Sequence, residues 1–518
     1  MAATIKLFVN GKEVEVEAGK NLIDAIGAVG IEIPHLCYHP ALGADGNCRL
    51  CLVGIEDGRP PLVPACKTPA AEGMKVLLDA EHIKKIQRDI MELELINHPI
   101  DCPVCDQAGE CKLQDFYMDY NATDSRFRVE KVAKDKKMDF GCGVVHDQER
   151  CVLCARCVRF TRNITKTGEL GIVNRTDQAR VEIFPGQPLN NRYALNVVDL
   201  CPVGAMTSKD FRFKQRVWFL KKNAGVCHGC SKGCAIYIDH NREKYGDDKI
   251  YRYRPRANEL VNGWFICDAG RMTYRLENEA RLTQPFAAGK EVSLEEGLQI
   301  AKEHLSKAHD LLFWVSPNCC LEQVAAIQAF ATDRDAAISG YSDGCIRQGD
   351  GDDFLIRDDK SANRAGLEIL GVPTDREGLK AMLRASDLVV LAGGAPQLTE
   401  DDDELLEELG KKTILLFTGR ETELAESAAV ALPVTTYSEY SGTVINCDGI
   451  LQHFRTAVVK NTPAPHLIDL LHRLGGPVAD TAAAWSLLGE TLPALEDLRP
   501  DQVPQTGLKL NDCEVSHA

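Results

Sequence analysis

Cysteine is the residue whose number and spacing could do chemistry in this chain. Of the 518 residues 21 are cysteine, and 16 of these lie in tight groups before residue 270. The N-terminus "MAATIKLFVNGKEVEVEAGK" has no apolar run behind a charged start, so we expect no export signal and a reducing compartment. Clustered cysteines in such a compartment indicate metal instead of disulfides. The sequence therefore predicts metal chemistry in the N-terminal half.

The first cysteine group is typical of a [2Fe–2S] centre. A long loop that supplies most of the thiolates, completed by one distant cysteine, resembles the plant-type ferredoxin arrangement, although this loop is longer. Four thiolates also suit tetrahedral zinc, but zinc sites usually pair two short knuckles and this group has only one. The predicted ligands are Cys37, Cys48, Cys51 and Cys66.

The second group follows in "HPIDCPVCDQAGEC", which reads H-x3-C-x2-C-x5-C. Three thiolates and an imidazole could hold zinc or a [4Fe–4S] cluster, and the spacing alone does not decide between them. The neighbouring groups favour a cluster, whose potential a neutral imidazole ligand should raise. The predicted ligands are His98, Cys102, Cys105 and Cys111.

The third group, "CVLCARCVRF", has three cysteines where a bacterial ferredoxin run has four. The position of the fourth is taken by Thr161. The next cysteine, Cys201, is followed by Pro202, which is the C-P signature of a closing cluster cysteine. A long loop closes at little extra cost, because closure entropy grows only logarithmically with length. The predicted [4Fe–4S] ligands are Cys151, Cys154, Cys157 and Cys201.

The fourth group, "CHGCSKGC" and then "FICDAG", again indicates a [4Fe–4S] site. Its predicted ligands are Cys227, Cys230, Cys234 and Cys267. Four histidines near the cysteine groups are not expected to bind metal: His35, His39, His146 and His228. Cys142 is interpreted as a structural or incidental thiol. Arg156, Arg159 and Lys232 are charges that could offset anionic clusters and tune their potentials.

The elements that position these groups change along the chain. Alternating residues 4–17 around Asn10-Gly11 predict a hairpin, and a short helix follows at "NLIDAIGAVG". Apolar residues at three- and four-residue spacing predict an amphipathic helix over 81–97. From about residue 286, apolar strands alternate with helices, which favours a parallel α/β sheet.

The predicted fold class is α+β followed by α/β. The predicted domains are a β-grasp [2Fe–2S] ferredoxin-like domain (1–80), a [4Fe–4S] segment with one histidine and three cysteines as ligands (81–125), a [4Fe–4S] ferredoxin-like domain (126–215), a fourth-cluster domain (216–285), an abbreviated molybdopterin-oxidoreductase-like domain (286–465) and a C-terminal tail (466–518).

The charge of the chain excludes some classes of partner. A formal net charge of −16 argues against a surface for nucleic acid or anionic membrane. No uncharged apolar run is long enough to span a bilayer, so membrane association is expected only through partners.

The acidic run at 400–410 predicts a solvated helix start whose carboxylates suit the helix dipole. We find no dinucleotide fingerprint, P-loop or flavin motif, so oxidation of NADH is expected to belong to a partner.

With the four groups in order, the sequence resembles the large iron–sulfur subunit of NADH:quinone oxidoreductase, respiratory complex I. The stretches that carry the resemblance are "HPIDCPVCDQAGECKLQD", "CVLCARCVRF", "DLCPVGAMTSK" and "ARLTQPF". The fourth group is similar to the additional [4Fe–4S] site of some bacterial members. "ALPVTTYSEYSGTVINCDGILQ" is similar to part of the molybdopterin oxidoreductase fold, here abbreviated. Active relatives of that fold usually have a lysine where this chain has Ala269, so the resemblance implies no molybdopterin.

The resemblance implies a subunit that carries electrons and has no NADH site of its own. One [2Fe–2S] and three [4Fe–4S] clusters would pass electrons from an NADH-oxidising flavin subunit, with a small [2Fe–2S] subunit, towards quinone. The alternative is the same subunit in a soluble NAD-linked hydrogenase or formate dehydrogenase. A molybdopterin enzyme and a zinc-stabilised interaction protein also remain open. The implied location is cytoplasmic, at the inner membrane only through a complex.

Overall fold

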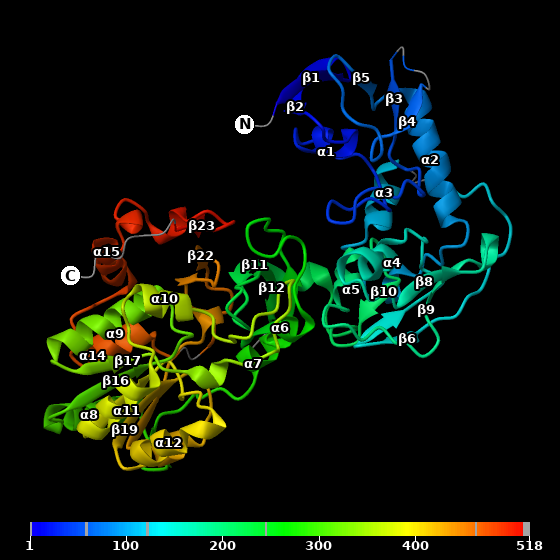
Figure 1. Cartoon of the computed structure of the whole chain (residues 1–518). Coiled ribbons are helices and arrows are strands. Elements are labelled where there is room, and N and C mark those ends of the chain that lie inside the picture. Colours follow the sequence, from blue (N-terminus) through cyan, green and yellow to red (C-terminus); the bar gives the residue numbers. More distant parts are fainter. Residues whose placement is uncertain are drawn as a thin grey trace. The chain divides into compact units, whose positions relative to one another are not determined.

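The computed structural model of the chain describes residues 3–56, 58, 61–120, 124–243, 246–461 and 464–510. The chain divides into two compact units, Met1–Phe219 and Leu220–Ala518 (Figure 1). Each unit has sheets and cores of its own. Cys513 lies outside the described residues.

The predicted N-terminal hairpin is confirmed and forms part of a five-stranded sheet. Strands β1 (Thr4–Val9) and β2 (Lys12–Glu17) pair antiparallel around Asn10 and Gly11, whose φ angles are 49° and 80°. Positive φ at both central residues is the signature of a tight hairpin turn. The sheet order is β2-β1-β5-β3-β4, and α1 (Leu22–Gly27) shares the core of this sheet. The other strands are β3 (Leu52–Ile55), β4 (Leu62–Pro64) and β5 (Lys75–Leu77).

Short elements around the cysteines make up the rest of the first unit. The predicted amphipathic helix is α2 (Glu81–Leu95), which buries Ile83 and Met91. Two small antiparallel sheets follow, one of β6, β7 and β10 and one of β8 and β9. The elements are η1 (Cys102–Val104), α3 (Lys112–Tyr120), β6 (Met138–Gly141), β7 (Val144–His146), α4 (Arg156–Arg159), η2 (Phe160–Ile164), β8 (Leu170–Val173), η3 (Thr176–Gln178), β9 (Arg180–Ile183), α5 (Asn196–Leu200), β10 (Met206–Ser208) and η4 (Val217–Phe219).

The second unit begins with an antiparallel sheet and continues into an α/β domain. The antiparallel sheet has the order β11 (Lys221–Val226), β12 (Ala235–Arg242) and β13 (Asp248–Pro255). Helices α6 (Asp268–Met272) and α7 (Tyr274–Asn278) follow and lie against β13. This sheet and α6 carry the fourth cysteine group.

A seven-stranded sheet of order β15-β14-β20-β19-β18-β16-β17 forms the centre of the α/β domain. Strands β16 to β20 are parallel, whereas β14 and β15 add an antiparallel edge. Side chains alternate between two cores, with Leu312 and Trp314 in one and Phe313 and Val315 in the other. Both faces are therefore buried under helices, as a mostly parallel sheet requires.

The strands of this sheet are β14 (Phe286–Ala287), β15 (Lys290–Glu291), β16 (Leu311–Val315), β17 (Ala337–Ser339), β18 (Leu388–Ala392), β19 (Thr413–Thr418) and β20 (Val430–Pro433). The helices between them are α8 (Leu294–Lys307), α9 (Leu321–Asp333), α10 (Arg364–Ile369), α11 (Arg376–Ala385), α12 (Asp403–Gly410) and α13 (Leu424–Ser427).

The residues beyond 465 do not stand apart from this domain. Helices α14 (Leu467–Arg473) and α15 (Thr481–Thr491) contribute Leu470 and Leu488 to the core that also contains α9. Strand β23 (Leu508–Lys509) pairs with β22 (Ile450–Phe454), which in turn pairs with β21 (Gly442–Ile445). The described part of the predicted tail thus packs as part of the α/β unit.

The prediction of a solvated acidic helix start is wrong for Asp402. This side chain is fully buried and accepts hydrogen bonds from the Arg376 guanidinium, the Tyr341 hydroxyl and the Thr399 backbone amide. The acidic residues around Asp402 made the whole run look solvent-exposed in the sequence. Contacts with distant residues bury this one carboxylate. Within the described ranges, every helix is too short or too polar to cross a bilayer.

Candidate metal centres

The first group of cysteines converges in the ferredoxin-like sheet. Cys37, Cys48, Cys51 and Cys66 are all buried, on the loop after α1, the loop before β3 and the turn after β4. Hydrogen bonds from the Cys48 and Cys66 thiols lower the pKa of Cys37, and the backbone amides of Gly46 and Cys48 add to this effect. A hydrogen bond from Cys66 lowers the pKa of Cys51 to about 7. Polar groups of the loop thus favour thiolates here.

The second group lies at the start of α3. Cys105 and Cys111 are buried, while Cys102 is half-buried. Burial raises the pKa of the Cys111 thiol to about 12, although the backbone amides of Gln114 and Leu113 at the helix start oppose this rise. The Arg216 guanidinium donates to the Cys105 carbonyl at 2.6 Å.

His98 lies just beyond α2, on the segment that leads to these cysteines. Burial lowers the pKa of its imidazole to about 4, so the ring is neutral at physiological pH. A neutral imidazole is the form that binds metal. Among the described contacts, none joins this ring to the three thiols, so its role as a ligand stays a prediction.

The third group of cysteines surrounds one cavity. Cys151, Cys154, Cys157 and Cys201 all line this cavity together with His146. Burial raises the pKa of each of the four thiols, that of Cys154 to about 12. Cys201 reaches the cavity because it ends α5, where Pro202 prevents further helix.

Thr161 occupies the place of a fourth ferredoxin cysteine for a structural reason. It is fully buried, and its hydroxyl donates to the Val158 carbonyl at 3.1 Å. Leu153 and Ala155, between the three cysteines, adopt φ angles of 50° and 57°. Non-glycine residues rarely adopt such angles, and they cluster where a loop must wrap a functional site.

The fourth group lies in the second unit, between β11, β12 and α6. All four cysteines are buried. Cys267 caps α6, and its sulfur accepts a hydrogen bond from the Gly270 amide at 3.2 Å. A Cβ atom on Gly270 would lie 3.0 Å from the Cys227 sulfur and 3.1 Å from the Cys267 sulfur. Glycine at position 270 therefore lets the backbone approach both sulfurs.

The predicted tuning charge Lys232 has a partner of its own. Its ammonium lies 2.6 Å from the Asp448 carboxylate, so its charge is balanced within the protein.

Three histidines near the cysteine groups are buried or stacked on an aromatic ring. Burial lowers the pKa of His39 to about 3 and that of His146 to about 4. The ring of His228 stacks on Tyr437 with 3.9 Å between centroids.

Residues that the sequence did not single out link the second and third groups. The Arg150 guanidinium makes two hydrogen bonds to the Asp101 carboxylate, at 2.9 and 2.6 Å, which ties the start of one group to the start of the other. A Cβ atom on Gly204 would lie 2.2 Å from the Cys105 sulfur. The "CPVG" turn after α5 therefore packs directly on the second group. The sequence held one signal of this contact: Arg150 directly precedes Cys151, and Asp101 directly precedes Cys102.

The donor sets fit iron–sulfur clusters. Twelve of the cysteines in the four groups are buried and three are half-buried. A buried thiolate is costly unless a metal replaces its proton, so metal binding would relieve the raised pKa values. In the described part of the chain, no three His, Cys, Asp or Glu side chains are gathered as ligands of a single metal ion. The assignment of each ligand remains a prediction.

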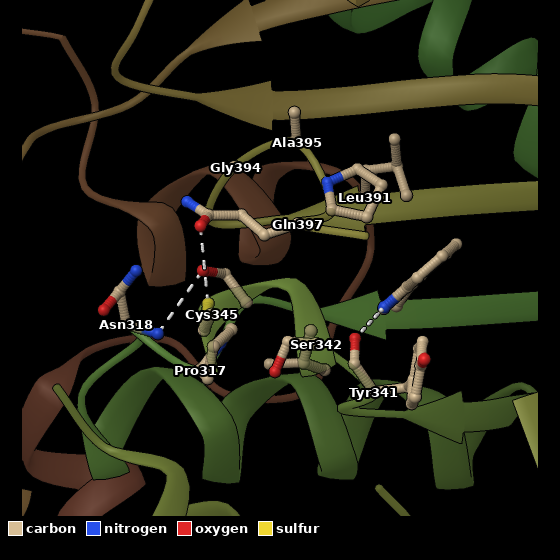
Figure 2. A pocket seen from close by; sticks show the side chains of 13 residues that line it. Pro317, Asn318, Tyr341, Ser342, Cys345, Leu391, Gly394, Ala395 and Gln397 are labelled. Carbon is tan, nitrogen blue, oxygen red and sulfur yellow. Dashed lines mark hydrogen bonds between the residues drawn. The ribbon is translucent and has the colours of Figure 1, made fainter. Parts of the chain in front are cut away.

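A small pocket lies where α/β proteins commonly bind ligands, at the carboxyl ends of β16 and β18 (Figure 2). The Cys345 thiol donates to the Gln397 side-chain oxygen at 3.5 Å, and the Trp314 indole donates to the Tyr341 carbonyl at 2.8 Å. None of the 13 lining residues is charged. The side chains that line this pocket therefore include no cation.

Four family models match this chain. They are the 2Fe-2S iron-sulfur cluster binding domain at residues 2–80, the NADH-ubiquinone oxidoreductase-G iron-sulfur binding region at 87–126, the ferredoxin-like domain of NADH-quinone oxidoreductase subunit 3 at 141–207, and molybdopterin oxidoreductase at 300–474. The predicted fold class, with ferredoxin-like, iron–sulfur and molybdopterin-oxidoreductase parts, is confirmed.

Relatives among known proteins match over 282 to 310 residues of this chain. The G subunit of NADH-quinone oxidoreductase from Streptomyces coelicolor is 40% identical over 310 residues, which is 58% of this chain and 36% of the relative. The corresponding protein of Rickettsia typhi is 39% identical over 300 residues, 57% of this chain and 43% of the relative. The NADH-ubiquinone oxidoreductase 75 kDa subunit of Reclinomonas americana is 38% identical over 282 residues, 54% of this chain and 40% of the relative.

The matches thus span less than half the length of these relatives. The resemblance to the large iron–sulfur subunit of NADH:quinone oxidoreductase is confirmed by these homologues. A crystal structure of NAD+-reducing [NiFe]-hydrogenase in the H2-reduced state is also similar, with a TM-score of 0.37 and 26% identity over 42% of this chain and 92% of that one.

Proposed function

We propose that this chain is an electron-transfer subunit that passes single electrons from an NADH-oxidising flavoprotein partner towards quinone. It would hold one [2Fe–2S] cluster at Cys37, Cys48, Cys51 and Cys66. It would hold three [4Fe–4S] clusters, one at His98, Cys102, Cys105 and Cys111, one at Cys151, Cys154, Cys157 and Cys201, and one at Cys227, Cys230, Cys234 and Cys267. When bound, such clusters supply one-electron redox chemistry whose potential the protein sets.

The observation that carries the proposal is the direct packing of one cysteine group on the next. The Gly204 backbone, three residues after Cys201, leaves no room for a side chain beside the Cys105 sulfur. The Asp101–Arg150 pair fixes the same two groups to each other. Consecutive redox centres held by shared elements are what a relay of electrons needs.

The residues of the chain would bind, position and shield the centres. Burial of the thiols excludes water, and backbone amides that point at the sulfurs stabilise their negative charge. The chain offers no charged lining in its α/β pocket, so we propose no molybdopterin chemistry there. The predicted domain boundaries up to residue 285 and a place at the inner membrane through partners belong to the same proposal.

The test is a native, anaerobic purification of the chain with its stoichiometric partners. A flavin subunit that reduces the clusters with NADH, together with quinone-site and membrane subunits, is the expected result. Recovery with a hydrogenase or formate dehydrogenase and no quinone-site subunit would support the alternative complex. A stoichiometric partner set without any flavoprotein would contradict both.

A further inference from the structure

Two guanidinium groups on α4 reach from the third cysteine group to the loop of the first. Arg156 donates to the Leu200 carbonyl, next to Cys201, at 3.2 Å, and also to the Tyr38 carbonyl. Arg159 donates to the Gly43 carbonyl at 2.9 Å and to the Cys37 carbonyl itself. The helix that carries Cys157 is thus bonded directly to the loop that carries Cys37.

Both arginines are buried cations without a carboxylate partner. Arg156 is 7% exposed and Arg159 is 9% exposed. All of their acceptors are backbone carbonyls, and among the described residues no Asp or Glu forms an ion pair with either guanidinium; each Nε atom also lacks a hydrogen bond. Buried charges are normally paired, because their desolvation is expensive. Among the described residues, no carboxylate therefore balances these two charges.

The cysteine sulfurs supply anions at the right place. Burial lowers the pKa of Arg156, and the charge of the neighbouring Arg159 lowers it further. The charges of Cys154 and Cys201, and to a smaller extent that of Cys37, act in the opposite direction. One guanidinium thus feels the charge of two different cysteine groups. A cluster with four thiolate ligands carries net negative charge, which an adjacent cation offsets.

We propose that Arg156 and Arg159 are a shared counter-charge for the centre at Cys37 and the centre at the Cys151 cavity. They raise the reduction potentials of both, because an added electron is stabilised by a nearby buried cation. This inference rests on the proposed function, since it needs both centres to be iron–sulfur clusters. It assigns a potential-setting role to two residues that bind no metal.

The test is an EPR-monitored redox titration of the full chain, prepared anaerobically with its clusters. Arg156→Gln and Arg159→Gln remove the charge but keep hydrogen-bond donors, so we expect both centres to become harder to reduce. The expected change is on the order of tenfold in the reduction equilibrium, which is about 59 mV for a one-electron couple. The centres at Cys102 and at Cys227 should keep their potentials.

Two comparisons separate this effect from a structural one. Arg162→Gln removes an exposed arginine beyond the same helix and should change no potential. Arg156→Lys and Arg159→Lys keep the charge, so both centres should keep reduction potentials close to those of the parent.

Unchanged potentials in the Gln variants, with iron content intact, would overturn the inference and leave the proposed function standing. Equal shifts in the Lys and Gln variants would also overturn it. If even the Lys variants lose both centres while Arg162→Gln retains them, the two arginines are needed for cluster assembly and not for setting the potentials, which also overturns the inference. A parent chain without iron or labile sulfide would instead refute the proposed function.

Discussion

The cysteines of the third group are held in surroundings that disfavour a free thiolate. Cys157 lies in the cavity of the third group, and burial raises the pKa of its thiol well above the ordinary value. Neighbouring thiolates add to this rise because like charges repel. Metal binding removes the proton and balances the charge, so folding and cluster binding should be coupled.

Cys201→Ser tests the ligand that the third group lacks in its own motif. We expect loss of one [4Fe–4S] EPR signal and of about four iron atoms per chain, because serine replaces a thiolate that lines the cavity. Cys142→Ser changes an exposed cysteine of the same unit and should leave iron and signals unchanged. Persistence of all three [4Fe–4S] signals in Cys201→Ser would show that another residue completes the site.

His466 in the α/β domain gives a pH dependence that needs no metal. Its ring contacts Tyr440 and lies within 3.3 Å of the Gln323 amide, and burial lowers the pKa of the imidazole to about 4. The unfolded chain, with a histidine pKa of about 6.5, binds the proton first, so stability falls as pH falls from 6.5 towards 4.

Denaturant unfolding at pH 7.5 and 5.5 measures this effect. The parent should lose about 1 kcal/mol more than His466→Gln between these pH values. His309→Gln alters an exposed histidine in the same unit and should behave as the parent does. The same pH response in parent and His466→Gln would show that this imidazole does not titrate on unfolding.

At the scale of elements, turns and helix ends position the cysteines more than strands do. Cys111 precedes α3, Cys201 ends α5 and Cys267 caps α6. Helix starts present free backbone amides, which favour the anionic form of a sulfur.

Gly204→Ala tests whether the turn after α5 must lie against the second group. The added methyl would meet the Cys105 sulfur at 2.2 Å, so we expect a loss of about 1–3 kcal/mol of stability and reduced iron at the Cys102 centre. Gly27→Ala, at the end of α1, meets nothing within 4 Å and should be tolerated. Normal iron content and EPR signals in Gly204→Ala would mean that the turn has room to move.

Short sequence patterns predicted the turns and helices that depend only on neighbouring residues. The Asn10-Gly11 turn lies where the sequence predicts it, and the helix predicted over 81–97 is α2 (Glu81–Leu95). The burial of Asp402 and the packing of α14 on the α9 core depend on contacts far along the chain, which no local pattern encodes. The bridge formed by Arg156 and Arg159 belongs to the same class, because its carbonyl acceptors at Tyr38 and Gly43 lie more than 100 residues away.

At the scale of the whole molecule, the two units differ in what they share with known proteins. Family models for iron–sulfur regions cover most of the first unit, whereas molybdopterin oxidoreductase matches the second at 300–474. Cysteine spacing and the Cys201-Pro202 pair predicted that Cys201 joins the third group, and these four cysteines line one cavity. The contacts between groups could not be predicted, since spacing says nothing about which loops meet.

The central claim is that this chain holds a series of one-electron centres. The most direct measurement is a stepwise reductive titration of the anaerobically prepared full chain, with iron, acid-labile sulfide and zinc counted on the same sample. We expect about 14 iron atoms per chain, a similar amount of sulfide, and separate EPR signals for one [2Fe–2S] and three [4Fe–4S] centres. Zinc in place of iron, without labile sulfide and with no reducible signal, would contradict it.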